Sequence, residues 1–153
     1  MTGNSSGIPG VDYDVIYDTV PQHLDNAKLL NQGGEAIVFE GENKAKKSVA
    51  LKIIHPIMRN GERFRKLQAQ IKRLPPVPAR TVGPEKPVYD STGKNIIGFG
   101  MKLIDIDKYD QLIWWTQQEY RLTNQIDVKD ISLVFYEIRQ EVDAAAKAGY
   151  VYA

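Results

Sequence analysis

The chain of 153 residues contains no cysteine, and no apolar run approaches the roughly 20 residues that a membrane-spanning helix needs. The first absence excludes disulfide bonds, thiolate metal sites and cysteine nucleophiles. The opening segment MTGNSSGIPG also lacks the basic end and the apolar stretch of a signal peptide. We therefore expect a cytoplasmic protein without a membrane segment.

Motifs for several kinds of chemistry are missing as well. The sequence contains no G-x-x-x-x-G-K-[ST] phosphate loop and no internal repeat. The two histidines, His23 and His55, have no acidic or histidine neighbour at ligand spacing, so we predict no metal site. What remains, 42% hydrophobic and 25% charged residues, is the composition of an ordinary globular domain.

Charge is spread unevenly along the chain, although the net charge is only +1. Residues 40–90 hold 12 Lys or Arg and 5 Asp or Glu, a local charge of +7, whereas residues 1–39 and residues 105–153 each sum to −4. A basic middle between acidic flanks indicates a surface that meets phosphate, on a nucleotide or on a nucleic acid. Solvated lysines scattered over loops and one helix would give the same totals.

The first half of the chain shows mainly the two-residue period of strands. Residues 1–10 are rich in Gly, Ser and Asn and are expected to form a flexible tail. Alternation in residues 11–17 predicts a strand or an extended arm. Three strands are then predicted at residues 27–31, 36–42 and 48–54, with turns at Gly33-Gly34 and at ENKAKK.

A basic amphipathic helix is predicted next. Asn60 is a candidate cap, and the apolar positions are Phe64, Leu67, Ile71 and Leu74. The helix is expected to stop at PPVPARTVGPEKP, which holds five of the eight prolines. Beyond it, two strands are predicted around a turn at residues 91–94, the second reaching about Ile104.

The rest of the chain has a helical period. Helices are predicted from Asp110 to Ile126 and from Lys129 to Ala148, with Gly149 just past the end of the second. We expect Trp115 to be a core residue and Trp114 to be partly exposed. Because the connections are too short for parallel crossovers, the sequence predicts an α+β fold with a twisted antiparallel sheet of about five strands and one packed helix. Two or more helices follow this sheet, so the predicted parts are 11–104 and 105–153.

One lysine stands out within an apolar strand. Residues alternate between the faces of a strand, so Ala50 and Lys52 should share one face, opposite Val49, Leu51 and Ile53. A lysine in that place needs an anion, or its charge must reach solvent. The Gly33-Gly34 turn can offer main-chain N–H groups to the same anion, which indicates a phosphate-holding arrangement. In the alternative interpretation, Lys52 lies on an edge strand and blocks pairing with another chain.

These residues resemble a known family. LNQGGEAIVFEG (residues 30–41) followed by VALKII (residues 49–54) is similar to the glycine-rich loop and the strand lysine of the protein kinase-like superfamily, G-x-G-x-x-G-x-V and then V-A-I-K. Aligned on Val38, Gly33 matches the second loop glycine, while Asn31 and Ala36 stand at the first and third. The run is more similar to bacterial kinase-like proteins whose loop reads G-G-E-G. GKNIIGFGMKLI (residues 93–104) resembles the strand that leads into their hinge, with Lys102 where a proline is common.

The resemblance implies the ATP-binding N-terminal lobe of a bacterial-type serine/threonine kinase-like protein. Lys52 would pair with the α- and β-phosphates of ATP, beside the loop of Gly33 and Gly34. The adenine would pack on Leu30, Val38 and Ala50, and it would meet the main chain from Met101 through Leu103 to Ile104. Glu62, the acidic residue of the following helix, would be the partner of the lysine.

The resemblance also implies an incomplete kinase. The last helix and AGYVYA look like the approach to a catalytic loop, but H-R-D, the loop Asn and D-F-G do not occur. We therefore expect no catalysis by this chain alone, Mg²⁺ only together with a missing second lobe, and a second lobe or protein partner over the helical end. The alternative prediction is a non-enzymatic module that uses its basic 40–90 region, in the helix at residues 60–74 and the KAKK turn, to contact nucleic acid or an acidic protein.

Overall fold

The computed structural model describes residues 10–150, and residues 1–9 and 151–153 lie outside that description. The tail expected at residues 1–10 falls outside it except for Gly10, and so does the end of AGYVYA. The described residues form two compact units. One unit holds residues 10–76 and 82–103, and the other holds residues 77–81 and 104–150.

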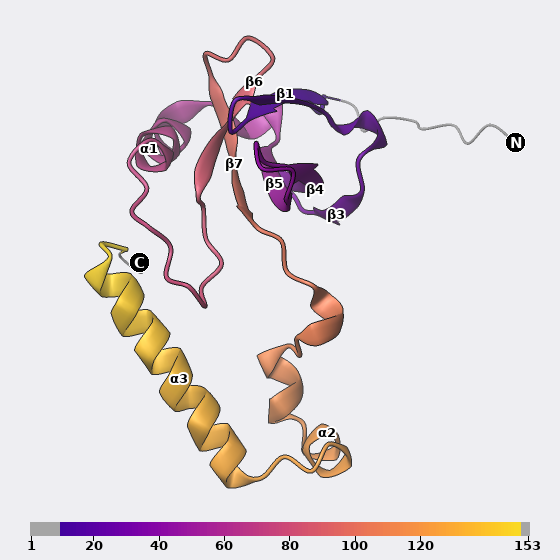
Figure 1. The fold of residues 1–153 in the computed structure, drawn as a ribbon, viewed down its shortest axis with the longest axis vertical. Helices are drawn as coiled ribbons and strands as arrows, with labels where there is room; N and C mark the ends of the chain where they lie inside the picture. The colour runs from indigo at the N-terminus through magenta and orange to yellow at the C-terminus, as the bar shows by residue number, and fades with distance from the viewer. Residues whose placement is uncertain (1–9, 151–153) are drawn as a thin grey trace, which may run out of the picture. The chain divides into compact units, whose positions relative to one another are not determined.

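The first unit is built on one antiparallel sheet of seven strands (Figure 1). The strands are β1 (Asp14–Tyr17), β2 (Val20–His23), β3 (Leu29–Gln32), β4 (Ala36–Glu42), β5 (Ser48–Ile54), β6 (Lys86–Asp90) and β7 (Ile96–Lys102). They lie in the order β2-β1-β6-β7-β5-β4-β3. The α+β class and the antiparallel sheet are confirmed, and β4 and β5 have the predicted bounds. The prediction of about five strands is wrong, because β1 and β2 extend the sheet beyond β6.

The β1–β2 hairpin shows why one of these strands escapes sequence reasoning. Its last register pair is Tyr17 with Val20, so the turn has two residues, Asp18 and Thr19, both with positive φ (48° and 68°). β2 contains Pro21, which argues against a central strand, but β2 lies at the edge of the sheet, where proline is tolerated. Asp18 is held by Lys86, whose Nζ donates to its carboxylate at 2.6 Å, and this hydrogen bond lowers the pKa of Asp18.

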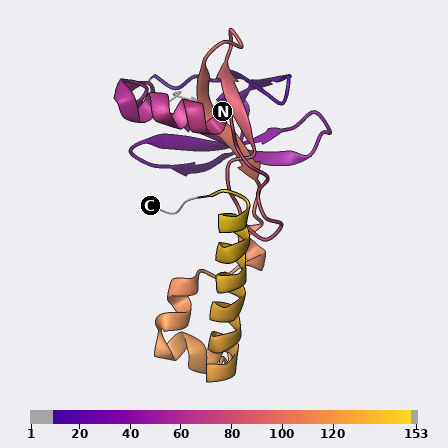
Figure 2. The ribbon, with the colours of Figure 1, turned by 90° about the vertical axis from the view of Figure 1, so that its left-hand side faces the viewer.

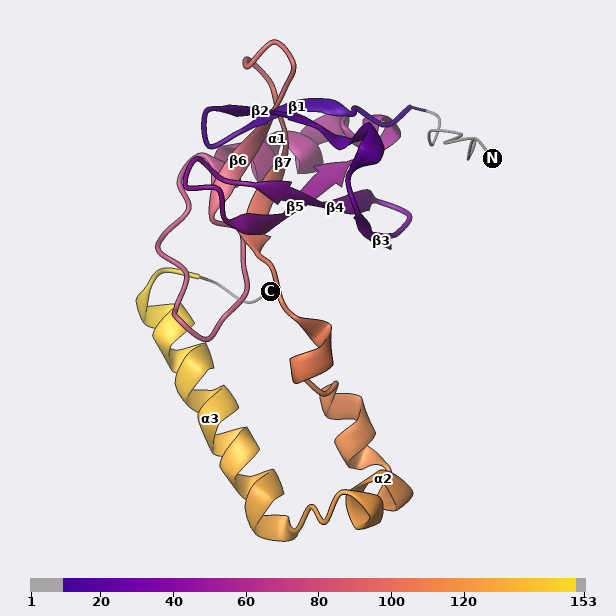
Figure 3. The same ribbon diagram turned by 45° about the vertical axis from the view of Figure 1, so that its right-hand side comes forward.

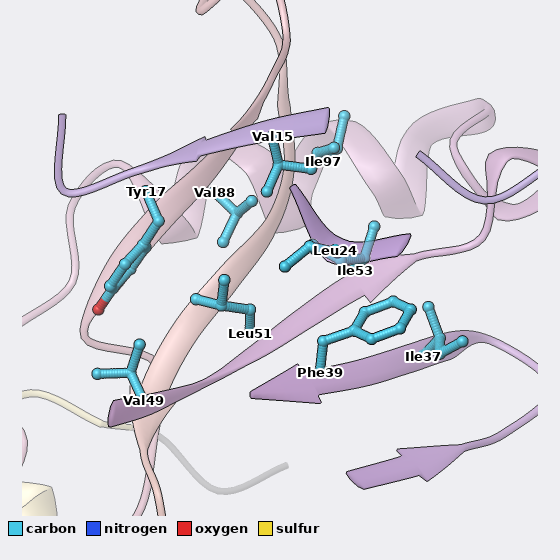
Figure 4. Close-up of a cluster of buried hydrophobic side chains, with 10 residues drawn as sticks. All are labelled: Val15, Tyr17, Leu24, Ile37, Phe39, Val49, Leu51, Ile53, Val88 and Ile97. Carbon is cyan, nitrogen blue, oxygen red and sulfur yellow. The ribbon is translucent and has the colours of Figure 1, made fainter. Parts of the chain in front are cut away.

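The core of this unit lies on one face of the sheet (Figure 4). It is formed by Val15, Tyr17, Leu24, Ile37, Phe39, Val49, Leu51, Ile53, Val88 and Ile97. The Tyr17 ring lies against Gly100, where a Cβ atom would come within 2.2 Å of the ring carbon Cε2. Burial is the main cause that raises the pKa of Tyr17 to about 12. Glycine at position 100 is therefore required by the packing of this tyrosine.

The opposite face carries helix α1 (Gly61–Ile71), seen beside the sheet in Figure 2. Phe64 of the helix packs with Ala36 and Ile54 in a second, smaller cluster of buried residues. Asn60 is the cap residue, as expected, but its side chain makes no capping hydrogen bond. The prediction that the helix reaches Leu74 is wrong. Leu74 precedes Pro75-Pro76, and a residue before proline disfavours the helical conformation.

Two 3-10 turns complete this unit. They are η1 (Leu24–Asn26), which follows β2, and η2 (Pro56–Met58), which joins β5 to α1. Arg59, just after η2, donates from Nε to the carbonyl of Ile54 at 2.8 Å. This bond fixes the approach to α1 against the end of β5.

The second unit is helical, and its helices α2 and α3 are labelled in Figure 3. It contains η3 (Ile106–Lys108), η4 (Leu112–Thr116), α2 (Gln118–Thr123) and α3 (Val128–Lys147). The single helix predicted from Asp110 to Ile126 is wrong. Gln117 is extended (φ −85°, ψ 123°) and separates η4 from α2. The carbonyl of Trp115 accepts a hydrogen bond from Arg121 Nη1 at 2.7 Å, a side-chain donor in place of a main-chain one.

Helix α3 agrees closely with the predicted range of Lys129 to Ala148. Asp127 caps it through reciprocal bonds with Asp130, and Gly149 follows its end with φ +98°. Trp115 is half-buried rather than a core residue, and Trp114 is 40% exposed and packs on the Tyr120 ring. Among the described residues, no helix has both the length and the apolar character that crossing a membrane requires.

Candidate functional site

Lys52 lies in the middle of the sheet. Its strand, β5, is paired with β4 on one side and with β7 on the other, so the interpretation of Lys52 as an edge-strand lysine is wrong. Val49, Leu51 and Ile53 belong to the main core, whereas Ile54 packs with the α1 side. The predicted face is thus confirmed: Lys52 shares the α1 side of the sheet with Ala50 and Ile54.

Strand register places the neighbours of Lys52. Val38 and Phe99 are its direct partners on β4 and β7, and Met101 is the partner of Ala50 in the next row. Directly opposite residues of an antiparallel pair project to the same face. Three of the predicted adenine contacts, Val38, Ala50 and Met101, therefore lie on the same face as the predicted phosphate ligand.

A cleft of about 920 Å³ opens between this face and α1. Its walls are formed by Lys52, Ile54 and Phe99 from the sheet, by Asn60, Glu62, Arg63, Phe64, Lys66, Leu67 and Gln70 from the helix region, and by Glu35, Met58 and Pro84. The volume lies within the range of small-molecule sites, about 300–1,000 Å³. Seven of the predicted site residues are not among those that line this cleft: Leu30, Gly33, Gly34, Val38, Ala50, Met101 and Leu103.

The charges of the cleft are paired, with one exception. Arg63 Nη2 lies 3.3 Å from Glu35 Oε1, and Lys66 Nζ lies 2.8 Å from Glu62 Oε1. Lys52 forms no ion pair within residues 10–150, and its Nζ lies 5.7 Å from the centroid of the Phe99 ring. Glu62 thus lines the cleft with Lys52, but its carboxylate binds Lys66. The cleft contains one cation whose charge no carboxylate compensates.

The Gly33-Gly34 turn is anchored to the end of β5. Gly33 N–H donates to the carbonyl of Ala36 at 2.9 Å, and His55 Nε2 lies 2.8 Å from the carbonyl oxygen of Gly33. The N–H of Gly33 is thus engaged within the turn, which leaves Gly34 as the glycine with an uncommitted N–H in this part of the described chain. Neither glycine has positive φ, and a Cβ atom on Gly34 would meet nothing within 4 Å. The fold itself therefore does not require glycine at position 34.

The predicted hinge follows the residue of β7 at which pairing with β6 ends. The last register pair of β6 with β7 is Lys86 with Gly100, and Glu85 N–H donates to the Gly100 carbonyl at 2.8 Å. β7 continues to Lys102 beside β5 only, and the direct partner of Met101 there is Ala50. Leu103 follows directly. Leu30 lies on β3 at a register shift between Leu29 and Asn31.

The histidines serve structural contacts. His23 Nδ1 lies 2.5 Å from the Asp14 carboxylate in the β1–β2 hairpin, and His55 holds the glycine turn. No group of three or more His, Cys, Asp or Glu able to hold a metal ion occurs in the part of the chain that the structure describes.

Three cleft residues were not identified from the sequence. Glu35 follows the glycine pair directly, and Arg63 follows Glu62, but their pairing joins segments 28 positions apart and leaves no local pattern. Phe99 lies between two glycines, and only the register of β5 with β7 reveals that it faces Lys52. In the sequence, the only feature that marks Phe99 is its position as a single aromatic residue between two glycines.

Comparison with known proteins gives no match to a family model, to a curated protein or to a solved structure.

Proposed function

We propose that the chain binds ATP with the phosphates at Lys52, as the N-terminal lobe of a serine/threonine kinase-like protein. The observation that carries the proposal is the uncompensated charge of Lys52 in a cleft whose other four charged side chains pair with one another. Lys52 is a half-buried residue without a carboxylate partner, and an anionic ligand would satisfy its charge. Gly34, which the fold does not require and which precedes the cleft residue Glu35, would give such a ligand access to a main-chain N–H.

The adenine would bind one row further along the same face. Ala50 is a small residue whose direct partners are the partly exposed Met101 on β7 and Glu40 on β4, and the partly exposed Val38 lies one row away, opposite Lys52. Apart from Glu40 and Lys52, this part of the face is apolar. β6 begins opposite Gly100, so beyond that residue β7 is paired with β5 alone. These features support the place proposed for the adenine beside Ala50.

The proposal is nucleotide binding and not phosphoryl transfer by these residues. The sequence holds no H-R-D or D-F-G, so the base and the magnesium ligands of a kinase have no counterpart in it. The described residues also lack a cluster of metal-binding side chains. They therefore do not fit a protein-held magnesium ion, and we derive no step through one.

The partner expected from the resemblance remains part of the proposal. Helix α3 exposes large apolar side chains, with Leu133 and Phe135 each 57% exposed and Tyr136 61% exposed. Exposed apolar surface of this kind marks an interaction site. We propose that the second lobe of a kinase-like protein covers it.

Calorimetric titration of ATP, with and without Mg²⁺, tests the nucleotide site. We expect saturable binding to the wild-type chain and at least about a tenfold loss of affinity in Lys52→Met, which keeps the apolar stem and removes the charge. Lys47→Ala, at an exposed position in the β4–β5 turn, is the matched control and should bind normally. Absence of binding, or equal affinity in Lys52→Met, would overturn the proposal.

The nucleic-acid alternative depends on whether the basic residues share one surface. Lys44 and Lys47 lie in the turn between Glu42 and Ser48, whereas α1 packs through Phe64 at the other end of the same hairpin. Strands of seven residues separate the two ends by about 20 Å. Six of the 12 basic side chains in residues 40–90 are also in ion pairs. Binding of oligonucleotides that weakens steeply with salt would favour this alternative all the same.

A further inference from the structure

Arg63 is a second cation on the wall of the same cleft. It lies in the first turn of α1, and its partner is Glu35, with 3.3 Å between Nη2 and Oε1. The two side chains are 85% and 58% exposed. An ion pair this exposed contributes little to stability, typically about 0.2–1 kcal/mol, so its cation is readily available to a stronger anion.

The position of Glu35 gives this pair a consequence for ligands. Glu35 directly follows Gly34, and it lines the cleft together with Lys52 and Arg63. An anion that lies along the glycine turn therefore approaches the Glu35 carboxylate and is repelled by it. The same anion also comes within reach of the Arg63 guanidinium, which binds phosphate through two parallel hydrogen bonds.

We propose that Arg63 exchanges Glu35 for the terminal phosphate of a nucleoside triphosphate, and that this exchange makes the site selective for three phosphates. The inference rests on the proposed ATP site. Lys52 holds the phosphates nearer the nucleoside, and only a longer phosphate chain reaches Arg63. In the unliganded protein Glu35 forms an ion pair with Arg63, and its carboxylate repels anionic ligands that do not displace it from Arg63.

Neighbouring cations on α1 provide controls. Lys66 lines the cleft, but it is held by Glu62 at 2.8 Å on its own helix. Arg65 is two positions from Arg63 and borders a different hollow, with Asp12, Asp90 and Asn95. Its Nε donates to the carbonyl of Gly61 at 3.4 Å. Arg65→Ala therefore removes the same charge from the same helix without touching the cleft.

The test is calorimetric titration of ATP, ADP and AMP against the full chain at one salt concentration. We expect the wild type to bind ATP more tightly than AMP, and Arg63→Ala to lose about tenfold in ATP affinity while AMP affinity stays within about twofold. Arg63→Lys should fall between them, because lysine keeps the charge without the bidentate geometry. Arg65→Ala should match the wild type. Glu35→Gln should bind ATP up to about fivefold more tightly, because the competing carboxylate is gone.

The outcomes separate this inference from the proposed function. If Lys52→Met weakens all three nucleotides while Arg63→Ala weakens them equally or not at all, the ATP site stands and the exchange of Arg63 is refuted. A loss in Arg65→Ala as large as in Arg63→Ala also refutes it, since the effect would then be one of overall charge. If the wild type binds none of the nucleotides, both the site and the exchange are refuted. Circular dichroism of each variant confirms that the loss is not one of folding.

Discussion

The Nζ atom of Lys52 lies 5.7 Å from the centre of the Phe99 ring, its direct register partner on the neighbouring strand. The negative face of an aromatic ring attracts a cation, but this attraction is much weaker than that of a phosphate. The ring therefore holds the ammonium group on the cleft wall without neutralising it. The positive charge of Lys52 therefore remains available to an anionic ligand in the unliganded protein.

A double-mutant cycle measures this contact. Phe99→Leu keeps an apolar wall and removes the ring face, and Lys52→Met removes the cation. We expect the two changes in the free energy of unfolding to be coupled by about 0.5–1 kcal/mol, as determined by urea denaturation of the wild type and the three variants. Additive effects would show that the contact is not formed in solution.

Two glycines should respond to alanine in opposite ways. A Cβ atom on Gly34 meets nothing within 4 Å and its φ is not positive, so Gly34→Ala should leave stability unchanged or raise it by up to about 1 kcal/mol. A Cβ atom on Gly100 would come within 2.2 Å of the Tyr17 ring, so Gly100→Ala should lower stability by about 1–3 kcal/mol. Urea denaturation distinguishes the two.

The same Gly34→Ala protein carries a functional prediction. If the ligand's phosphates approach the turn closely, the added methyl group should weaken ATP binding although folding is intact. Calorimetry on the variant provides the measurement. Unchanged affinity would place the phosphates away from the turn.

Acid should destabilise the turn that joins β6 to β7. Burial would raise the pKa of Asp90, but hydrogen bonds from Thr92 and Asn95, each 2.6 Å long, outweigh it and lower the pKa from 3.8 to about 2. Between these two values the unfolded chain binds more protons than the folded chain, so the free energy of unfolding falls as the pH falls from about 4 to about 2.

Asp90→Asn tests this dependence. The amide does not titrate, so the variant should be less stable than the wild type near pH 6 and should lose less stability between pH 5 and pH 2.5. Chemical denaturation at several pH values gives both quantities. A wild-type curve and a variant curve that remain parallel through this range would contradict the role of Asp90.

The spacing of apolar residues predicted those strands and helices in which it is regular. The bounds of β4 and β5 followed from their alternation, and α3 followed from its apolar period and Gly149. β2 has no such pattern, because Pro21 and two polar residues fill a short edge strand. The single helix predicted around Trp114 and Trp115 is not formed. Side chains of Thr116 and Arg121 donate hydrogen bonds to the main-chain carbonyls of Ile113 and Trp115, and these bonds stabilise two separate helical segments.

The candidate site was predictable only in part. The two-residue period placed Ala50 and Lys52 on one face, and the glycine pair marked the turn before β4. The pairing of Glu35 with Arg63, and that of Glu62 with Lys66 in place of Lys52, depends on how α1 packs on the sheet. The shift in register between β6 and β7 puts Ile97 into the main core and likewise arises from pairing between strands.

Amide chemical shifts of the full chain, followed during titration with ATP, show whether the nucleotide binds at Lys52. We expect the largest changes at Gly33, Gly34, Ala50, Lys52, Met101 and Leu103, little change in the KAKK turn at residues 44–47, and loss of this pattern in Lys52→Met. Changes centred on residues 44–47 and on Lys72 and Arg73, or no changes at all, would contradict a nucleotide site at Lys52.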